Sequence, residues 1–308
     1  MKQLLQLIFL LTLSFISAQK QNSKIDSIKT EQDAENLIRS FGENYKYFKI
    51  QKISDFKEEF GSYGYCEKIA DSLNLKKSFY KADFDHNGLT DILVIGNYYD
   101  FNIFIVLDFG DNNLKLNRLT RDHRKCTFPV IKENSLIDYY FMSQPLWFTK
   151  EEPKLLKRQL VYHFDDFIEY NAELKKYNIE KIEYRATMCF GTCPAFYITI
   201  EKDRKGTLKA DGYNINPLTK KEIKGKFNAK IDIQHFNEII NLLNYLDFPN
   251  LEDNYSISVT DYPTSYLTIT YDNGKTKSIK DYGQNGTFGL RRVYKFFSDL
   301  RFNQDWKE

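Results

Sequence analysis

Two kinds of hydrophobic spacing follow one another along the chain, and together they predict an α+β protein. Short runs in which every second residue is apolar, typical of half-buried strands, dominate residues 78–107 and 182–213. Apolar residues recur every three or four positions in residues 31–41, 233–246 and 290–300, which predicts amphipathic helices. Because strands and helices are segregated, mostly antiparallel sheets with one or two packed helices fit better than a doubly wound sheet.

The first half of the chain predicts an antiparallel meander. Strand-like runs at Phe79–Ala82, Ile92–Ile95 and Phe101–Leu107 are separated by spacers too short for a crossover helix. A helix from about Glu31, with Thr30 and Asp33 at its start, is expected to lie on this sheet. Further strands are expected at 129–131, 136–141 and 160–167.

The beginning of the chain has the pattern of a secretory signal peptide. The apolar run Leu4–Ile16 is too short for a membrane span, and the small Ala18 suits a cleavage position. No cysteine lies at the expected cleavage point, so no lipid attachment is expected. We therefore expect residues 1–18 to be removed and the mature protein to be secreted or periplasmic, in a compartment where disulfides persist.

Length and charge narrow the remaining choices. The 308 residues exceed the usual single-domain size of about 100 to 150, which predicts two domains. The polar, lysine-rich segment 171–178 is the expected linker between domains at 24–170 and 179–308. Lys and Arg number 44 against 42 Asp and Glu, and the two signs are mixed along the chain, which argues against nucleic acid as a partner.

An acidic loop between the first two strands of the meander has the spacing of a calcium site. Ca²⁺ takes six to eight oxygen ligands, and alternate loop positions converge on one ion when a glycine permits a sharp bend. Gly88 lies at the position of that bend. The predicted ligands are Asp83, Asp85, Asn87, Asp91 and the carbonyl of Leu89.

This loop resembles the calcium loops of integrin-type propeller blades. The resemblance covers about a dozen residues and has no second copy, so it implies a bound ion and not a propeller. The alternative is a plain hairpin turn at Asn87 and Gly88. Bound calcium would be structural, because no nucleophile or base lies beside the loop in the sequence, and His86 is expected to point outward.

Cys189 and Cys193 interrupt a strand pattern, which predicts a hairpin at this point. A three-residue loop containing Gly191 would set the two cysteines at the hairpin end, where opposed Cα atoms lie about 4.5 to 5.5 Å apart, within disulfide range. Cys66 and Cys126 would then pair within the first domain, although four cysteines allow three pairings. A structural disulfide is favoured over a redox pair, because reactive pairs commonly begin a helix.

The spacing of Cys189, Cys193 and Pro194 is also similar to the copper loops of certain cytochrome oxidase assembly proteins. In that family a distant histidine is the third ligand, and His163 or His235 would take this role here. The thioredoxin-like βαβ pattern of those proteins is missing, so copper binding remains the lesser alternative.

Several features of the second half together resemble a bacterial domain family of unknown function, family 6438. They are Arg185, the run Cys-Phe-Gly-Thr-Cys-Pro at 189–194, Tyr197, the helix before Pro249, the run Thr-Asp-Tyr-Pro at 260–263 and Trp306. The resemblance covers about residues 179–306 and implies a secreted or envelope protein, with no activity attached. Arg185 and Asp261, beside the marked positions, are expected to form either a ligand site or a buried ion pair.

The chain offers no complete catalytic signature. The nucleophile elbow Gly-x-Ser-x-Gly, the zinc motif His-Glu-x-x-His and a phosphate-binding glycine loop are missing from the sequence, and His123 and His163 are expected to be surface or packing residues. We therefore expect a non-enzymatic binding or structural module with a protein or small-ligand partner in the cell envelope. The alternative is a thiol-disulfide redox or copper protein that acts through Cys189 and Cys193.

Overall fold

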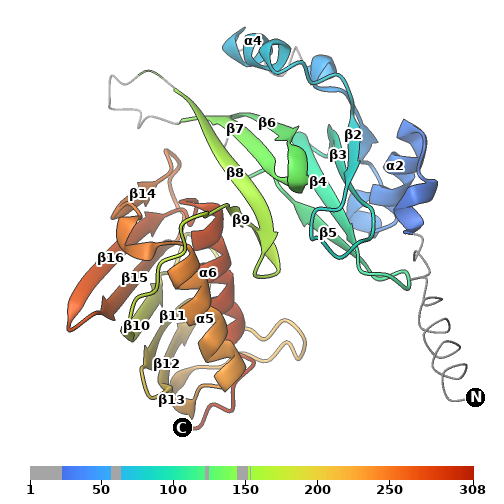
Figure 1. The fold of residues 1–308 in the computed structure, drawn as a ribbon. Helices are drawn as coiled ribbons and strands as arrows, with labels where there is room; N and C mark the ends of the chain where they lie inside the picture. The colour runs from blue at the N-terminus through green and yellow to red at the C-terminus, as the bar shows by residue number, and fades with distance from the viewer. Residues whose placement is uncertain (1–22, 57–63, 122–124, 144–151, 153) are drawn as a thin grey trace, which may run out of the picture.

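The strands of this protein form three sheets that gather into two regions (Figure 1). The structure, a computed structural model, describes residues 23–56, 64–121, 125–143, 152 and 154–308. The expected signal peptide at 1–18 and His123 lie outside the described residues. The sheets are mostly antiparallel and carry packed helices, which confirms the α+β class.

The first sheet has α2 (Glu31–Arg39) on one face and the second sheet on the other. The predicted start of α2 is confirmed, because Thr30 and Asp33 form a reciprocal capping box there. Leu37 and Ile38 of the helix pack against alternate residues of β3 and β4. The strands are β1 (Lys49–Ile50), β2 (Phe79–Ala82), β3 (Asp91–Asn97), β4 (Phe101–Asp108) and β5 (Leu114–Arg118).

The second sheet completes the N-terminal region. Its strands, in the order β6-β7-β8-β9, are β6 (Lys125–Ile131), β7 (Ile137–Met142), β8 (Leu155–His163) and β9 (Asp166–Glu169). The single strand expected at 160–167 is wrong: Phe164 and Asp165 have φ of 53° and 63°, so the chain turns back between β8 and β9. Cys126 of β6 forms a disulfide with Cys66 of α4 (Gly64–Ser72), a helix that the sequence did not predict.

The third sheet forms the C-terminal region and has both remaining long helices on the same side (Figure 1). Its strand order is β13-β12-β11-β10-β15-β16-β14, and only β14 runs parallel to its neighbour. The helices are α5 (Ile233–Tyr245) and α6 (Phe288–Leu300). The strands are β10 (Ile179–Ala186), β11 (Ala195–Glu201), β12 (Lys205–Gly212), β13 (Gly225–Lys230), β14 (Asn254–Ser256), β15 (Thr264–Tyr271) and β16 (Lys275–Tyr282).

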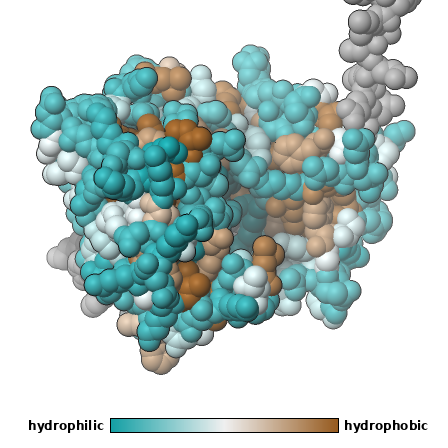
Figure 2. Space-filling view, turned by 90° about the horizontal axis from the view of Figure 1, so that it is seen from below, coloured by the Kyte–Doolittle hydropathy of each residue, from teal (hydrophilic) through white to brown (hydrophobic). Residues whose placement is uncertain are grey.

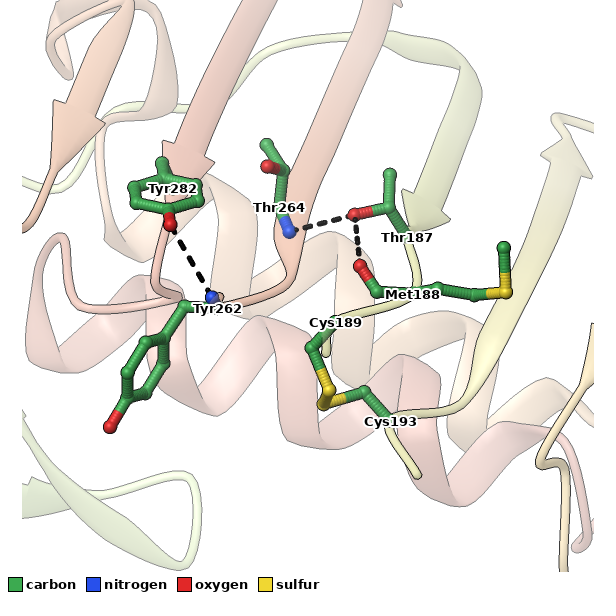
Figure 3. Close-up of a disulfide and its surroundings, with 7 residues drawn as sticks. All are labelled: Thr187, Met188, Cys189, Cys193, Tyr262, Thr264 and Tyr282. Atoms are coloured by element: carbon green, nitrogen blue, oxygen red, sulfur yellow. Dashed lines mark hydrogen bonds between the residues drawn. A yellow bond between two sulfur atoms is a disulfide. The ribbon is translucent and has the colours of Figure 1, made fainter. Parts of the chain in front are cut away.

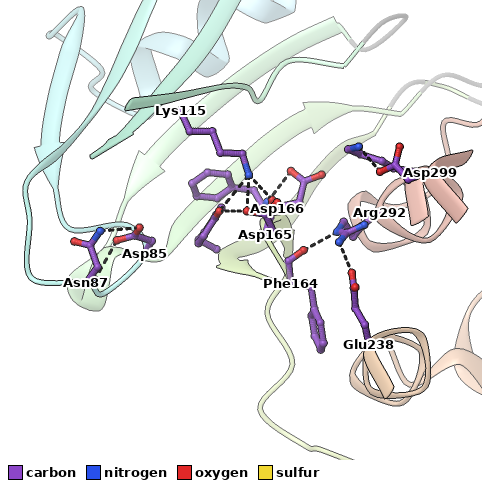
Figure 4. Close-up of polar contacts among 12 residues, drawn as sticks. Asp85, Asn87, Lys115, Phe164, Asp165, Asp166, Glu238, Arg292 and Asp299 are labelled. Atoms are coloured by element: carbon purple, nitrogen blue, oxygen red, sulfur yellow. Dashed lines mark hydrogen bonds and ion pairs between the residues drawn. The ribbon is translucent and has the colours of Figure 1, made fainter. Parts of the chain in front are cut away.

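The two regions meet where β9 contacts the start of α6. The Glu169 carboxylate accepts hydrogen bonds from the backbone N–H groups of Phe288 (2.7 Å) and Gly289 (2.8 Å). A carboxylate at a helix N-terminus is favourable because it satisfies free N–H groups and meets the positive end of the helix dipole. Arg292 extends the contact, since its Nε donates to the Phe164 carbonyl at 2.6 Å while its guanidinium pairs with Glu238 (Figure 4).

No helix in the described part of the chain is long and apolar enough to cross a membrane. Seen from below, hydrophilic residues cover most of the surface, and hydrophobic residues form separate patches (Figure 2).

Candidate functional site

The connection between β10 and β11 is longer than the sequence indicates. The last paired residues are Ala186 and Phe196, so the strand pattern that continues to Met188 does not form a strand there. Instead the loop bonds to the segment before β15: Thr187 exchanges hydrogen bonds with Thr264, and the Phe190 N–H donates to the Asp261 carbonyl at 3.2 Å. A neighbouring strand therefore competes for the backbone groups that a tight hairpin would have used.

Cys189 and Cys193 are joined by a disulfide within this loop, with a Cα–Cα distance of 5.5 Å (Figure 3). Gly191 lies between them at a φ of 149°, in the region that favours glycine. Both cysteine pairings expected from the sequence are confirmed, because Cys66 and Cys126 form the second bond. No helix begins at the 189–193 loop, so the feature that lowers the thiol pKa in reactive pairs is missing from it.

A pocket of about 860 Å³ opens beside the Cys189–Cys193 disulfide. Its floor is aromatic: Tyr184 and Phe196 come from the sheet, and Tyr294 comes from α6. The rim is charged and includes Asp261 and, from α6, Arg291, Lys295, Ser298 and Asp299. An apolar floor with a few polar groups at the rim is the usual composition of a ligand site.

The tyrosines of the pocket floor are held by buried hydrogen bonds. The Tyr184 hydroxyl and the Gln284 amide both bond to the Ser265 hydroxyl, at 2.8 and 2.9 Å. The Tyr294 hydroxyl donates to the Asp281 carboxylate at 3.0 Å. Burial raises the pKa of Tyr184 and of Tyr294 above the usual value, so both phenols stay protonated at neutral pH and cannot act as bases.

Arg301 supports the pocket floor from beneath Phe196. Its guanidinium lies 4.4 Å from the Phe196 ring centroid and donates to Asn214 at 2.8 Å. Burial lowers the pKa of Arg301 to about 10, so the side chain remains charged at neutral pH. Asn214 in turn donates to the Ala195 carbonyl at 2.9 Å, next to the cysteine loop. The pocket is thus pre-formed by packing that continues into the loop.

The structure does not bring Arg185 and Asp261 together. Asp261 lies on the pocket rim at a φ of 72°, whereas Arg185 lies on the opposite face of the sheet, 5.9 Å from the centroid of Tyr266. Successive strand residues point to opposite faces, so Tyr184 facing the pocket requires Arg185 to face away. The alternative of a buried ion pair is wrong as well, because both side chains are exposed.

The histidines considered as copper ligands also lie away from the cysteines. His163 packs on Phe164 and Tyr245, with ring centroids 4.1 and 4.9 Å away, and burial lowers its pKa. His235 bonds to Asn303 and Gln304, which follow the end of α6. Neither residue lines the pocket beside Cys189 and Cys193. The described residues therefore do not assemble a site with two cysteines and one of these histidines.

The acidic loop forms a second candidate site, in the N-terminal region. Carboxylate oxygens of Asp83, Asp85 and Asp91 all lie within 4.8 Å of one another. Asp91 is fully buried and accepts the N–H groups of Phe84 (2.7 Å) and Asp108 (2.8 Å), which fixes its orientation. Burial, reinforced by the Asp85 charge, raises the pKa of Asp91 to about 7. A cluster of hard oxygen donors of this kind fits Ca²⁺.

Asn87 holds this loop together through its side-chain amide. Its Nδ2 donates to Asp85 (3.0 Å) and to the Asp108 carbonyl (2.7 Å), while its Oδ1 accepts the Leu89 N–H at 2.7 Å. Asn87 is therefore engaged with the protein through both its amide nitrogen and its amide oxygen. His86 is exposed at the loop tip, as expected. The contribution of β4 to this loop could not be read from residue spacing, because Asp108 reaches Asn87 and Asp91 only in the folded chain.

The comparisons with known proteins concern the C-terminal region. Residues 180–301 match the model of a family described as a domain of unknown function (DUF6438). No curated protein and no solved structure matches the chain. The matched residues include the disulfide loop and all of the pocket lining, so the C-terminal half of this protein is similar to that family of unknown function.

Proposed function

We propose that the protein is a secreted or periplasmic binding module, and not an enzyme, that holds its ligand in the pocket beside Cys189 and Cys193. The observation that carries this proposal is a pre-formed aromatic pocket whose floor holds phenols that stay neutral. Such a surface binds and orients a ligand, and its two buried phenols supply no base at neutral pH. Two disulfides and the signal-peptide pattern support an extracytoplasmic location.

The ligand of this pocket is expected to carry an apolar or aromatic group and a charged end. Tyr184, Phe196 and Tyr294 provide the apolar floor, and Arg291 and Lys295 stand at the rim. Large exposed apolar residues lie on the same rim or in the disulfide loop itself: Met188 and Phe190 are 64% and 89% exposed, and Tyr262 is 38% exposed. Exposed apolar side chains of this kind mark contact surfaces, so the bound group extends beyond the pocket onto the loop.

A fluorescent dye tests this proposal. Anilinonaphthalene sulfonate combines aromatic rings with an anionic end, so the unchanged protein should bind it at a single site. Thr260→Trp places a large ring at the pocket rim and should weaken binding at least tenfold. Thr219→Trp is the matched control, because Thr219 is exposed and does not line the pocket. It should change the affinity for the dye less than twofold. Equal binding by both variants would exclude the pocket as the site.

The alternative function is thiol-disulfide exchange through Cys189 and Cys193. It is supported by one observation: the partly exposed disulfide lines the pocket, where a substrate could reach it. An insulin reduction assay separates the proposals. The binding module should show no activity above background, whereas an oxidoreductase should show activity that Cys189→Ala with Cys193→Ala removes.

We also propose that Asp83, Asp85 and Asp91 bind Ca²⁺ as a structural ion. The convergence of their carboxylates within 4.8 Å supports this assignment. When bound, the ion neutralises acids that otherwise repel one another. Asn87 and the Leu89 carbonyl remain the proposed additional ligands, and for Asn87 this requires its amide to exchange its present partners.

A further inference from the structure

The C-terminal sheet has a second face that no element in the described part of the chain covers. Helices α5 and α6 pack on one side, where Ile198, Leu208 and Leu267 are buried (Figure 1). The alternate residues point the other way, and we call the surface they form the open face. Its charged members are Lys181, Glu183, Arg185, Glu201, Lys205, Lys209, Asp211, Lys226, Lys230 and Lys280.

A row of cations and tyrosines crosses the open face from strand to strand. The register aligns Lys226 with Lys209, Lys209 with Tyr197, Tyr197 with Arg185, Arg185 with Tyr266, and Tyr266 with Lys280. Neighbouring strands lie about 4.8 Å apart, so this row spans about 24 Å. It includes no acidic residue. Its residues come from six strands spread over nearly one hundred positions of sequence, so only the pairing of the strands assembles it.

The acids of the open face are largely neutralised by nearby lysines. One of these lysines, Lys209, belongs to the row, and the other three cations of the row keep free charges. Lys181 pairs with Glu183 at 3.1 Å and with Glu201 at 4.0 Å, and Lys209 pairs with Asp211 at 2.9 Å. In the described ranges no carboxylate lies within ion-pairing distance of Lys226 or Lys280. The Arg185 guanidinium lies 5.9 Å from the Tyr266 ring centroid and forms no ion pair with a carboxylate of the described residues. Cations held in this way attract an anion without first breaking an ion pair.

The next row of the open face is rich in hydroxyl groups. The register aligns Asn228, Thr207, Thr199, Glu183, Thr268 and Ser278 beside the cationic row. Thr199 bonds to Thr207 at 2.7 Å, and Thr268 bonds to Ser278 at 3.2 Å. Each hydroxyl has a donor and two acceptor positions, so these pairs keep capacity for a ligand that has many hydroxyl groups.

We propose that the open face binds a linear polysaccharide that carries carboxylate groups, which goes beyond the ligand pocket on the other side of the sheet. The carboxylates meet Arg185, Lys226 and Lys280, and the sugar rings lie against Tyr197 and Tyr266. The hydroxyl row bonds to the sugar hydroxyls. Acids remain among the lysines, so the face suits a polymer with one charge per sugar better than one with dense sulfate or phosphate. The sequence pI of about 8.1 also falls below the value typical of nucleic-acid-binding domains.

Titration of the full-length mature protein with polygalacturonate at low salt tests this assignment. Arg185→Gln, Lys226→Gln and Lys280→Gln together remove three charges from the row and should weaken binding at least tenfold. The control variant, Lys49→Gln, Lys68→Gln and Lys132→Gln, removes three exposed charges from the N-terminal region and should weaken it less than twofold. Adding Tyr266→Ser should weaken polygalacturonate binding a further severalfold. Thermal melting of each variant verifies that it is folded.

Three parallel titrations distinguish the ligands. Neutral dextran should not bind measurably, and dextran sulfate and single-stranded oligothymidine should bind more weakly than polygalacturonate. Tighter binding of oligothymidine would overturn the proposal in favour of a nucleic acid, and tighter binding of dextran sulfate would overturn the carboxylate assignment. No binding of polygalacturonate, or equal losses in the row and control variants, would overturn the open face as a binding surface. Dye binding at the pocket should be unchanged in the row variant, so failure here leaves the pocket proposal intact.

Discussion

The two regions of this protein each contain one disulfide, and the two bonds differ in what they hold. Cys66 and Cys126 are 60 residues apart, nearly fully buried, and join helix α4 to the second sheet. Cys189 and Cys193 are only 4 residues apart and lie partly exposed beside the pocket. The first bond closes a large loop of the N-terminal region, whereas the second fixes the shape of a single turn. The same covalent chemistry therefore stabilises a whole region in one place and fixes a loop beside a pocket in the other.

Removing the long-range disulfide should have the largest effect. In the chain-entropy model, a loop of 60 residues corresponds to about 4 kcal/mol of stability, because the bond restricts the unfolded chain. We expect Cys66→Ala with Cys126→Ala to lower the urea midpoint substantially while leaving dye binding at the pocket intact. If this variant lost no more stability than the variant without Cys189 and Cys193, the expected difference between the two bonds would be wrong.

Calcium should stabilise the N-terminal region by the next largest amount. At calcium a hundredfold above its dissociation constant, a ligand that binds only the folded state adds about 2.7 kcal/mol. Differential scanning calorimetry with calcium and with chelator measures this shift. Asp91→Asn should abolish it, and Asp111→Asn, in a neighbouring loop, should retain it. Identical melting curves in calcium and chelator, with no heat on titration, would exclude the ion.

Removing the short-range disulfide should lower the stability less than removing the long-range one, but it should weaken dye binding at the pocket more. A ring of 4 residues gives about 1 to 2 kcal/mol in the same model. The Phe190 bond to the Asp261 carbonyl is expected to loosen, which opens the pocket wall. We expect Cys189→Ala with Cys193→Ala to reduce dye affinity severalfold and to lower the urea midpoint less than loss of the Cys66–Cys126 bond does. Unchanged affinity in this variant would show that the bond does not shape the pocket.

The contact between the regions should give the smallest effect. Glu169→Gln keeps the shape of the side chain but removes the charge at the start of α6, a change typically of about 0.3 to 1 kcal/mol. Hydrogen exchange at Phe288 and Gly289 should rise in this variant. Glu173→Gln, an exposed change in the segment between the regions, should leave both stability and exchange unchanged.

Local features of the fold could be predicted because neighbouring residues determine them. Thr30 and Asp33 cap α2, and Asp232 caps α5, through bonds to backbone groups two or three positions away. The alternation in β10 likewise determines that Tyr184 and Arg185 face opposite sides of the sheet. This signal could have shown from the sequence that Arg185 does not share a site with Asp261. The three aspartates of the acidic loop converge for a similar reason, since all lie within nine positions.

The features that depend on distant residues could not be predicted in the same way. Hydrophobic alternation does not say which strands join which sheet, so the division of the N-terminal strands between two sheets was missed, as was the parallel pairing of β14. Met188 continues a strand pattern, but Thr187 and Phe190 bond to the segment before β15 instead. Competition between backbone partners is settled only when the whole sheet is assembled.

The sequence by itself determined the periodicity of the elements, their caps, the closeness of the acidic residues and the turn between Cys189 and Cys193. The tertiary structure decided the pocket and the open face, since both combine side chains from several strands and helices. Charge shows the physical reason most clearly. Lysines and acids are mixed along the chain, but pleating and strand register place Arg185, Lys226 and Lys280 in one row without an acid between them. The order of residues sets each side chain's face, and only long-range pairing sets its neighbours.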